Sequence, residues 1–253
     1  LLARAFRGRA LQLAARVRAG RPPADQLDRL PKLVAEHVLR SGVKPGAVAR
    51  SVSFTQTAEL RLKPGTSFRT FAAFQVIGTG HSGFLWEARQ TAGSLIGVRV
   101  IDAFVGGQGL IEARAMGSVP VVRSASADIS VAEAYRYLAE LPWAPDAIVG
   151  NPELEWRDTG DRRVEVRLKI AAGEAAVTFD FDARGDIVAV QARGRPATDA
   201  RGKTVRYDWV GKFGEYSQFG PRRVPATAEV GYVYPTGYEA YFKGRIADYH
   251  VST

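Results

Sequence analysis

The chain has 253 residues, 46% hydrophobic and 24% charged, so its composition is that of a globular protein and excludes a disordered one. It contains no cysteine, which excludes disulfides, thiolate metal sites and a cysteine nucleophile. The net charge is +9, but the basic residues are dispersed and lack a compact block with stacking aromatics, so we expect no nucleic-acid partner.

Two helices are predicted at the N-terminus. The first covers 1–19, where apolar residues at helical spacing alternate with arginines, and such a basic amphipathic helix is a candidate for contact with an anionic membrane surface. The second covers 24–40, and Pro31 is expected to bend or divide it. We assign 1–45 to an N-terminal helical segment and expect both helices to pack at one end of the rest.

The sequence begins at Leu1 rather than Met, so we expect a segment upstream of it. No run reaches the roughly 18 apolar residues that span a bilayer, and no signal peptide is recognisable. The compartment is left open. With an upstream anchor, the protein would be membrane-associated or extracytoplasmic.

From residue 46 onward the pattern is that of β-strands. Apolar and polar residues alternate over 52–62, Pro64 and Gly65 mark a turn, and 68–77 returns as a second strand. Further strands separated by glycine-bearing turns are predicted at 84–90, 95–104 and 110–115.

One helix interrupts the strands, at about 130–141. Ser130 and Glu133 have the spacing of a capping box, and Pro142 ends the helix. About six more strands follow, with turn signals roughly every ten residues. We therefore predict an α+β fold, mostly β. In it, 46–253 form one curved antiparallel sheet or half-barrel of about ten to twelve strands, with the helix in or across its concave face.

The glycine-rich run Gly78–Gly83 resembles two functional motifs, a dinucleotide-binding loop and the nucleophile elbow of hydrolases. The run Gly78–Gly83 matches G-x-G-x-x-G, but no crossover helix follows it, so a hairpin turn is favoured over a dinucleotide site. The segment around Ser82 matches the G-x-S-x-G motif of a hydrolase elbow except for its final glycine, which is replaced by Phe84. The three histidines, at positions 37, 81 and 250, have no metal-binding spacing. We expect neither a cofactor nor a metal.

Charged residues within apolar runs are expensive unless they are paired or lie in a polar site. They are either structural ion pairs or a small polar group in a pocket, and the many aromatics are either core or the wall of a cavity. The candidate ligand-binding residues are Trp86, Asp102, Arg136, Tyr137, Glu140, Trp143, Trp156, Arg193 and Tyr241.

The segment 136–148, which begins Arg-Tyr-Leu-Ala-Glu-Leu-Pro-Trp-Ala-Pro, resembles the central signature of an uncharacterised bacterial family. The segments 151–156, 179–182, 207–209 and 237–244 look similar too, so the resemblance covers most of the chain after Ser51. It implies no catalytic residues. The fold it implies is similar to the half-barrel of bacterial lipoprotein carriers, which by itself is weak support for a function.

Three functions are consistent with this sequence. The leading hypothesis is binding of a hydrophobic small molecule or lipid in a cavity of the sheet. The first alternative is a cofactor-free enzyme acting on a small hydrophobic substrate, with Asp102 or Glu140 as acid or base. The second alternative is a structural, membrane-associated protein whose basic first helix contacts lipid headgroups.

Overall fold

The computed structural model describes residues 2–61, 63–91, 97–115, 119–199 and 203–253. Its helices are α1 (Leu2–Arg18), the 3-10 helix η1 (Leu27–Arg29), α2 (Lys32–Arg40), α3 (Ala127–Ala139), the 3-10 helix η2 (Leu141–Trp143) and α4 (Pro145–Gly150). Its strands are β1 (Ser51–Leu60), β2 (Arg69–Gly78), β3 (Phe84–Gln90), β4 (Val98–Val105), β5 (Gln108–Ala115), β6 (Val119–Ser124), β7 (Leu154–Gly160), β8 (Arg163–Ile170), β9 (Gly173–Phe181), β10 (Ile187–Thr198), β11 (Thr204–Phe219), β12 (Arg222–Tyr234) and β13 (Gly237–Ser252).

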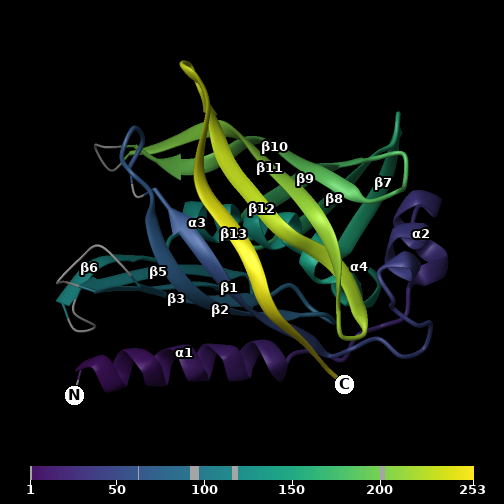
Figure 1. Ribbon diagram of the computed structural model, residues 1–253, viewed down its shortest axis with the longest axis horizontal. Helices are drawn as coiled ribbons and strands as arrows, with labels where there is room; N and C mark the ends of the chain where they lie inside the picture. Colours follow the sequence, from purple (N-terminus) through teal and green to yellow (C-terminus); the bar gives the residue numbers. More distant parts are fainter. Residues whose placement is uncertain (1, 62, 92–96, 116–118, 200–202) are drawn as a thin grey trace.

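Within these ranges, thirteen strands form one antiparallel sheet in the order β6-β5-β4-β3-β2-β1-β13-β12-β11-β10-β9-β8-β7. The sheet curves around the helices without closing, because β6 and β7 form two separate edges (Figure 1). The predicted mostly-β half-barrel is therefore confirmed. The strand count exceeds the expected ten to twelve, because β6 was not predicted and seven strands rather than about six follow α3.

Alternating sequences place one side of each strand in the core. On β8, Val164 and Val166 are fully buried, whereas the alternate residues Glu165 and Arg167 are half-buried and ion-paired to each other. The Gly78–Gly83 run links β2 to β3 as a hairpin, in which the Gly78 amide donates to the Gly83 carbonyl at 2.9 Å. The hairpin interpretation of this motif is confirmed.

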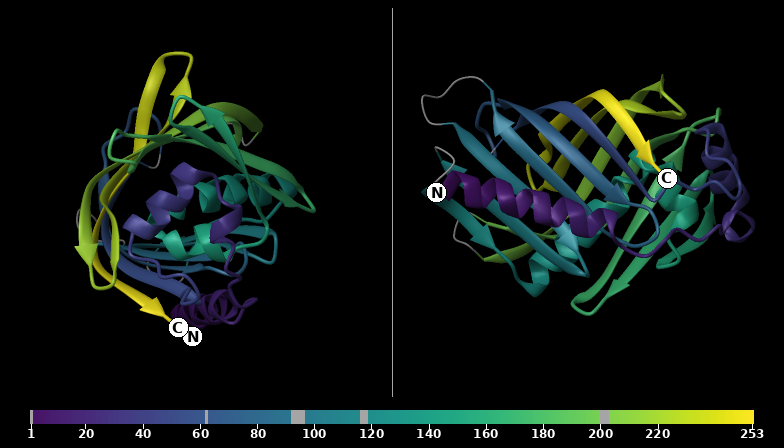
Figure 2. Two further views of the ribbon diagram at one scale, coloured as in Figure 1. Left: turned by 90° about the vertical axis from the view of Figure 1, so that its right-hand side faces the viewer. Right: turned by 90° about the horizontal axis from the view of Figure 1, so that it is seen from below.

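Helix α3 lies inside the concave face of the sheet, as predicted (Figures 1 and 2). It packs between β4 and β5 on one flank and β8, β9 and β10 on the other. The following η2 and α4 are buried over their whole length. The concave side is thus largely filled by the chain itself, with aromatic contacts such as Phe54 against Trp143.

The start of α3 differs from the prediction. The helix begins at Ala127, and the Ser126 hydroxyl caps it by accepting from the Ile129 amide at 3.2 Å. The capping box was wrong because the Ser130 hydroxyl binds the amide of Gly109 on β5 at 3.0 Å, and the Glu133 side chain is buried inside the sheet.

Helix α1 lies along the convex face of β2 to β5, so the expectation that both N-terminal helices pack at one end was wrong for α1 (Figure 2). Its buried side chains cover outward-facing apolar residues that would otherwise meet water. The two sets form a second core cluster: Phe6, Ala10, Ala14 and Val17 on α1, and Val76, Leu85, Ile101 and Ala103 on the strands.

Helix α2 packs beside α4, and Pro31 precedes it, so the predicted division of the second helix is confirmed. Its Val34 and Val38 belong to the main core.

The domain boundary between 45 and 46 stays a prediction. Parts of four predicted elements lie outside the described residues: Leu1, Leu62, 95–96 and the turn at 200–202.

Candidate ligand-binding site

One face of α3 carries charge into the interior. Glu133, Arg136 and Glu140 are spaced three and four residues apart, which places them on the same side of the helix. Asp102 reaches this face from β4 and Arg195 from β10. We call the connected group the polar cluster; its members are Gln56, Gln75, Asp102, Glu133, Arg136, Glu140 and Arg195.

Arg136 is the hub of the cluster. Its Nη1 donates to Asp102 Oδ2 and its Nε donates to Glu140 Oε1 at 2.7 Å. The guanidinium also lies over the rings of Phe84 and Trp86, 4.8 and 5.3 Å from their centroids. The Arg136 and Asp102 side chains keep 17% and 14% of their surface exposed, so the cluster is accessible at this point.

The cluster continues along the sheet through two glutamines. Gln75 on β2 donates to Glu140 Oε2, and Gln56 on β1 donates to Gln75 Oε1 at 3.3 Å. Both glutamines are almost fully buried, at 3% exposure or less. Antiparallel pairing of β1 and β2 makes them diagonal neighbours, because Gln56 pairs with Ala73, two residues from Gln75 on the same face.

Aromatic side chains surround Arg195 on the other side of the cluster. Its guanidinium lies 4.9 Å from the Trp209 ring centroid, and its Nη1 donates to the Tyr232 hydroxyl. Its Nη2 is 3.8 Å from Glu133 Oε1. Tyr241 stacks on Tyr232 at 5.3 Å and accepts a hydrogen bond from Trp209. These tyrosines are only partly buried, so they form an amphipathic wall beside the cluster.

The cluster contains three carboxyl groups and two guanidinium groups. Burial raises the pKa of Glu133 well above its usual range, and the negative charge of neighbouring Asp102 raises it further. Burial also raises the pKa of Glu140, although Arg136 opposes the shift. Glu133 therefore holds a proton more readily than an exposed glutamate, and the protonated group can donate a hydrogen bond to Asp102.

Several buried polar atoms in and beside the cluster have no hydrogen-bond partner. They are the Nε1 of Trp86, the Nε of Arg195, and one side-chain oxygen each of Gln56, Asp102 and Glu133. A hydrogen bond from protonated Glu133 can join it to Asp102, but it leaves two donors and one acceptor unmatched. Unmatched buried groups of this kind are uncommon in folded proteins and mark places that receive water or a ligand.

The structure brings five of the nine predicted site residues together: Trp86, Asp102, Arg136, Glu140 and Tyr241. Asp102 and Glu140, the acid or base of the enzyme hypothesis, are both ion-paired to Arg136. The other four lie elsewhere. Trp143 and Trp156 pack against Phe213 and Phe179, respectively, and Arg193 is exposed.

Arg195, which was not among the predicted residues, occupies the place in the cluster that the sequence suggested for Arg193. The register of β10 against β11 shifts between Ala192 and Arg195, and Gly194 adopts a φ of +59° there. This bulge turns Arg195 into the core and leaves Arg193 outside. The sequence analysis also missed Glu133, for which the shared helical face with Arg136 and Glu140 was the available signal.

Tyr137 belongs to a second polar network, at the β2–β3 hairpin. Its hydroxyl accepts from the Asn151 amide at 2.9 Å and donates to the His81 carbonyl at 3.3 Å. The same Asn151 amide group donates to the Ser82 hydroxyl at 2.9 Å. These bonds attach α3 and α4 to the glycine-rich hairpin and give Ser82 a structural role.

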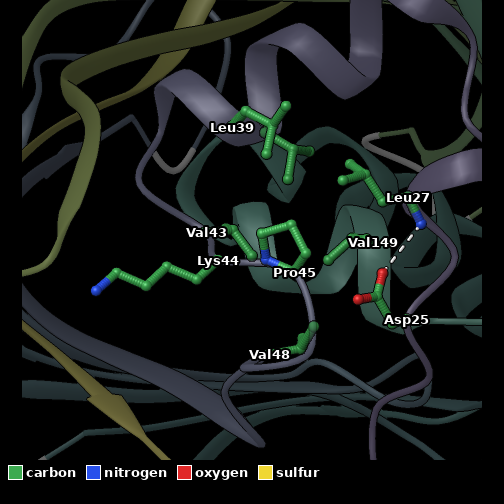
Figure 3. Close-up of a pocket in the computed structure, with 9 residues that line it drawn as sticks. Asp25, Leu27, Leu39, Val43, Lys44, Pro45, Val48 and Val149 are labelled. Carbon is green, nitrogen blue, oxygen red and sulfur yellow. Dashed lines mark hydrogen bonds between the residues drawn. The ribbon is translucent and has the colours of Figure 1, made fainter.

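A hollow between α2, α4 and the segment 43–48 is lined mainly by aliphatic side chains, with Asp25 bonded to the Leu27 amide at its edge (Figure 3). The hollow has essentially no room for a sphere the size of a water molecule, so it does not hold a ligand. Over the described ranges, no group of three or more His, Asp and Glu side chains has the arrangement of a metal site. None of the helices described is long and apolar enough to cross a membrane.

Solved structures with a similar fold cover about nine tenths of the chain. A domain named for outer membrane lipoprotein sorting, from Vibrio parahaemolyticus, has 12% identity and a TM-score of 0.46, over 90% of this chain and 94% of the other. A LolA superfamily protein from Nitrosomonas europaea has 6% identity and a TM-score of 0.42, over 91% and 94%. A DUF1329 family protein from Desulfovibrio piger has 9% identity and a TM-score of 0.42, over 90% and 94%.

No curated protein sequence matches this chain significantly. One family model matches it over residues 21–244, from the end of the first helix to the last strand, and that family is described only as one of unknown function. The predicted relationship to an uncharacterised family is confirmed: the chain belongs to the family of unknown function DUF6544.

Proposed function

We propose that the protein binds a small amphipathic molecule, a lipid or another hydrophobic compound with a polar end, beside the polar cluster. The observation that supports this most is the set of unmatched buried polar atoms next to an accessible ion pair, Arg136 with Asp102. The polar end of the molecule would supply the missing partners, and its apolar part would lie against the sheet.

The inner surface next to the cluster suits an apolar chain. Across the sheet, Val100, Ala88 and Ala73 follow one another in register toward Gln56, so small apolar side chains border the polar group. Val100 is only partly buried, as are Tyr232 and Tyr241. Because α3 fills the middle of the concave face, we place the ligand at this accessible margin rather than along the whole sheet.

Displacement of an environment-sensitive apolar dye from the purified, delipidated protein tests this proposal. We expect saturable dye binding that long-chain amphiphiles reverse. Val100→Trp should weaken binding about tenfold or more by filling the space, since a steric overlap of 1.4 kcal/mol already gives that factor. Val233→Trp is the matched control, because Val233 is 37% exposed. No saturable binding, or equal binding by both variants, would refute the site.

We also propose that α1 contacts an anionic lipid surface. Leu2–Arg18 contains no acidic residue, its Leu11 is 63% exposed, and four of its arginines point to solvent: Arg4, Arg7, Arg16 and Arg18. A basic helix face of this kind gains roughly 1 kcal/mol per basic residue near anionic headgroups. Because α1 covers the convex face, the concave site would stay open on the other side.

Vesicle flotation tests the α1 contact. We expect binding to vesicles rich in phosphatidylglycerol at low salt, loss of binding at high salt, and little binding to phosphatidylcholine. Arg4, Arg7 and Arg16 changed to Gln should abolish it. The matched control changes Arg157 and Arg163, which are 66% and 56% exposed on β7 and β8. Equal binding to both kinds of vesicle would contradict the proposal.

A further inference from the structure

The hydrogen-bonding groups left unmatched at the polar cluster are of both kinds. Trp86 Nε1 and Arg195 Nε are donors, and Gln56 Oε1 is an acceptor. All three residues are at least nine-tenths buried. A ligand group that only accepts hydrogen bonds would leave Gln56 Oε1 without a partner, and one that only donates would leave the two donors without partners. Each buried group left without a partner weakens binding.

Both guanidinium groups of the cluster are already paired with carboxyl groups of the cluster. Arg136 binds Asp102 and Glu140, while Arg195 faces Glu133 and Tyr232. The flat faces of both guanidinium groups lie over aromatic rings, those of Phe84 and Trp86 for Arg136 and those of Trp209 and Tyr232 for Arg195. No cation of the cluster is left over to neutralise an incoming anion.

These two observations discriminate between classes of head group. A carboxylate or phosphate would add a negative charge beside three carboxyl groups and would leave Gln56 unmet. An ammonium group has only donors, so it would leave Trp86 and Arg195 unmet. A hydroxyl or a primary amide donates and accepts at once and brings no charge.

We propose that the polar cluster selects amphiphiles with an uncharged head group that both donates and accepts hydrogen bonds, a hydroxyl or a primary amide, over the same chain ending in a carboxylate or an ammonium group. The inference rests on the proposed binding function and specifies its ligand class. The apolar chain provides affinity in every case, and the head group decides the order of preference.

The test uses four saturated chains of one length that end in a primary alcohol, a primary amide, a carboxylate and an ammonium group. Each competes for the same apolar dye on the delipidated protein near neutral pH. We expect the alcohol and the amide to bind about tenfold or more tightly than either charged chain, the ratio that one unsatisfied buried group produces. This comparison uses the unaltered protein, so it does not depend on a variant that folds.

Variants then locate the preference. Glu133→Gln removes one carboxyl group without changing shape, and should raise the affinity for the carboxylate chain several-fold relative to the affinity for the alcohol. Trp86→Phe removes one donor and should weaken the alcohol and the amide. Arg193→Gln is the control, because Arg193 is exposed two residues from buried Arg195.

Two failures are distinguishable. If the carboxylate or the ammonium chain binds as tightly as the alcohol, or more tightly, the head-group selection is refuted while binding itself stands. If none of the four chains displaces the dye, or if the dye does not bind, the proposed function is refuted as well. An unchanged order of preference in Glu133→Gln together with Trp86→Phe would place the selecting groups elsewhere and overturn the assignment to this cluster.

Discussion

The two faces of the sheet both bury carboxyl groups, but they pair them in opposite proportions. On the convex face, Glu112 is 1% exposed and lies between two arginines, with Arg114 at 2.6 Å and Arg9 at 3.2 Å. On the concave face, three carboxyl groups share Arg136 and Arg195. On the convex face two arginines face one carboxyl group, whereas on the concave face carboxyl groups outnumber arginines.

This difference separates a structural joint from a candidate site. The Arg9–Glu112 pair attaches α1 to β5 beside the apolar contacts of that helix, and its arginine is partly solvated. The concave cluster is larger and keeps several unmatched donors and acceptors, whereas the one unmatched oxygen of Glu112 still faces the Arg9 guanidinium. Folding does not require such groups, so their presence favours a role in recognition.

The largest effect expected is on Arg136. Arg136→Ala should lower the free energy of unfolding by about 4 kcal/mol, because it leaves Asp102 and Glu140 buried without a cation. Arg114→Ala on the convex face should cost only about 1 kcal/mol, since Arg9 still faces Glu112. Urea unfolding of both variants measures the two values. Equal losses would contradict the proposed difference between the ion pairs of the two faces.

Apolar packing, rather than charge, should hold the convex layer. Phe6 is 1% exposed under α1, so Phe6→Ala should cost about 3 kcal/mol, up to the full free energy with which α1 docks. Faster hydrogen exchange confined to the amides of α1 would show undocking of the helix alone. Leu11→Ala, at a position 63% exposed, is the control and should change stability by less than about 0.5 kcal/mol.

Replacing one buried carboxyl group with a neutral amide should change the free energy of unfolding in opposite directions on the two faces. The raised pKa of Glu133 contributes stability below its ordinary value of 4.5, and this contribution is lost as the pH rises through the raised pKa. Glu133→Gln should therefore match the wild type in acid and exceed it by about 1 kcal/mol in the alkaline range. Glu112→Gln should instead lose about 1 kcal/mol at neutral pH, because two arginines lose their partner.

The measurement is the difference in urea midpoint between each variant and the wild type across the pH range. Taking the difference removes other titrating groups that both proteins share. One such group is His37, whose pKa burial lowers to about 4, and which makes the fold more stable as the pH rises from there to 6.5. If the difference in urea midpoint between Glu133→Gln and the wild type is the same at every pH, Glu133 does not hold a proton in the folded protein.

The sequence predicted the concave face better than the convex one. Strand alternation and hairpin turns indicated the curved sheet, and charges within apolar runs pointed to Asp102, Arg136 and Glu140. The position of α1 could have been inferred from the sequence of β2 and β3, where the consecutive residues 76–77 and 84–86 are all apolar; in the structure all of them are buried. Strands buried on both faces must be covered on both.

Residues of the site escaped prediction where the backbone departs from a regular period. A bulge in β10 reverses which of two arginines faces inward, and alternation cannot locate a bulge in advance. Glu133 was assigned to a cap because its spacing from Ser130 fits that motif equally well. Tyr241 was among the predicted residues, but Tyr232 was not, because the two meet only through the pairing of β12 with β13, a contact that no local pattern records.

The smallest effects should come from the exposed arginines of α1, and their signs should differ by position. Arg4 lies in the first turn, where the helix dipole disfavours a cation, and Arg16 lies in the last turn, where it favours one. Arg4→Gln should therefore stabilise the protein by about 0.3 kcal/mol and Arg16→Gln should destabilise it by a similar amount. Both differences are measurable as paired shifts of the urea midpoint at low salt, and both should shrink when salt is added. A loss above about 1 kcal/mol in either variant would mean that surface charge, and not only the packing of Phe6, holds α1 to the sheet.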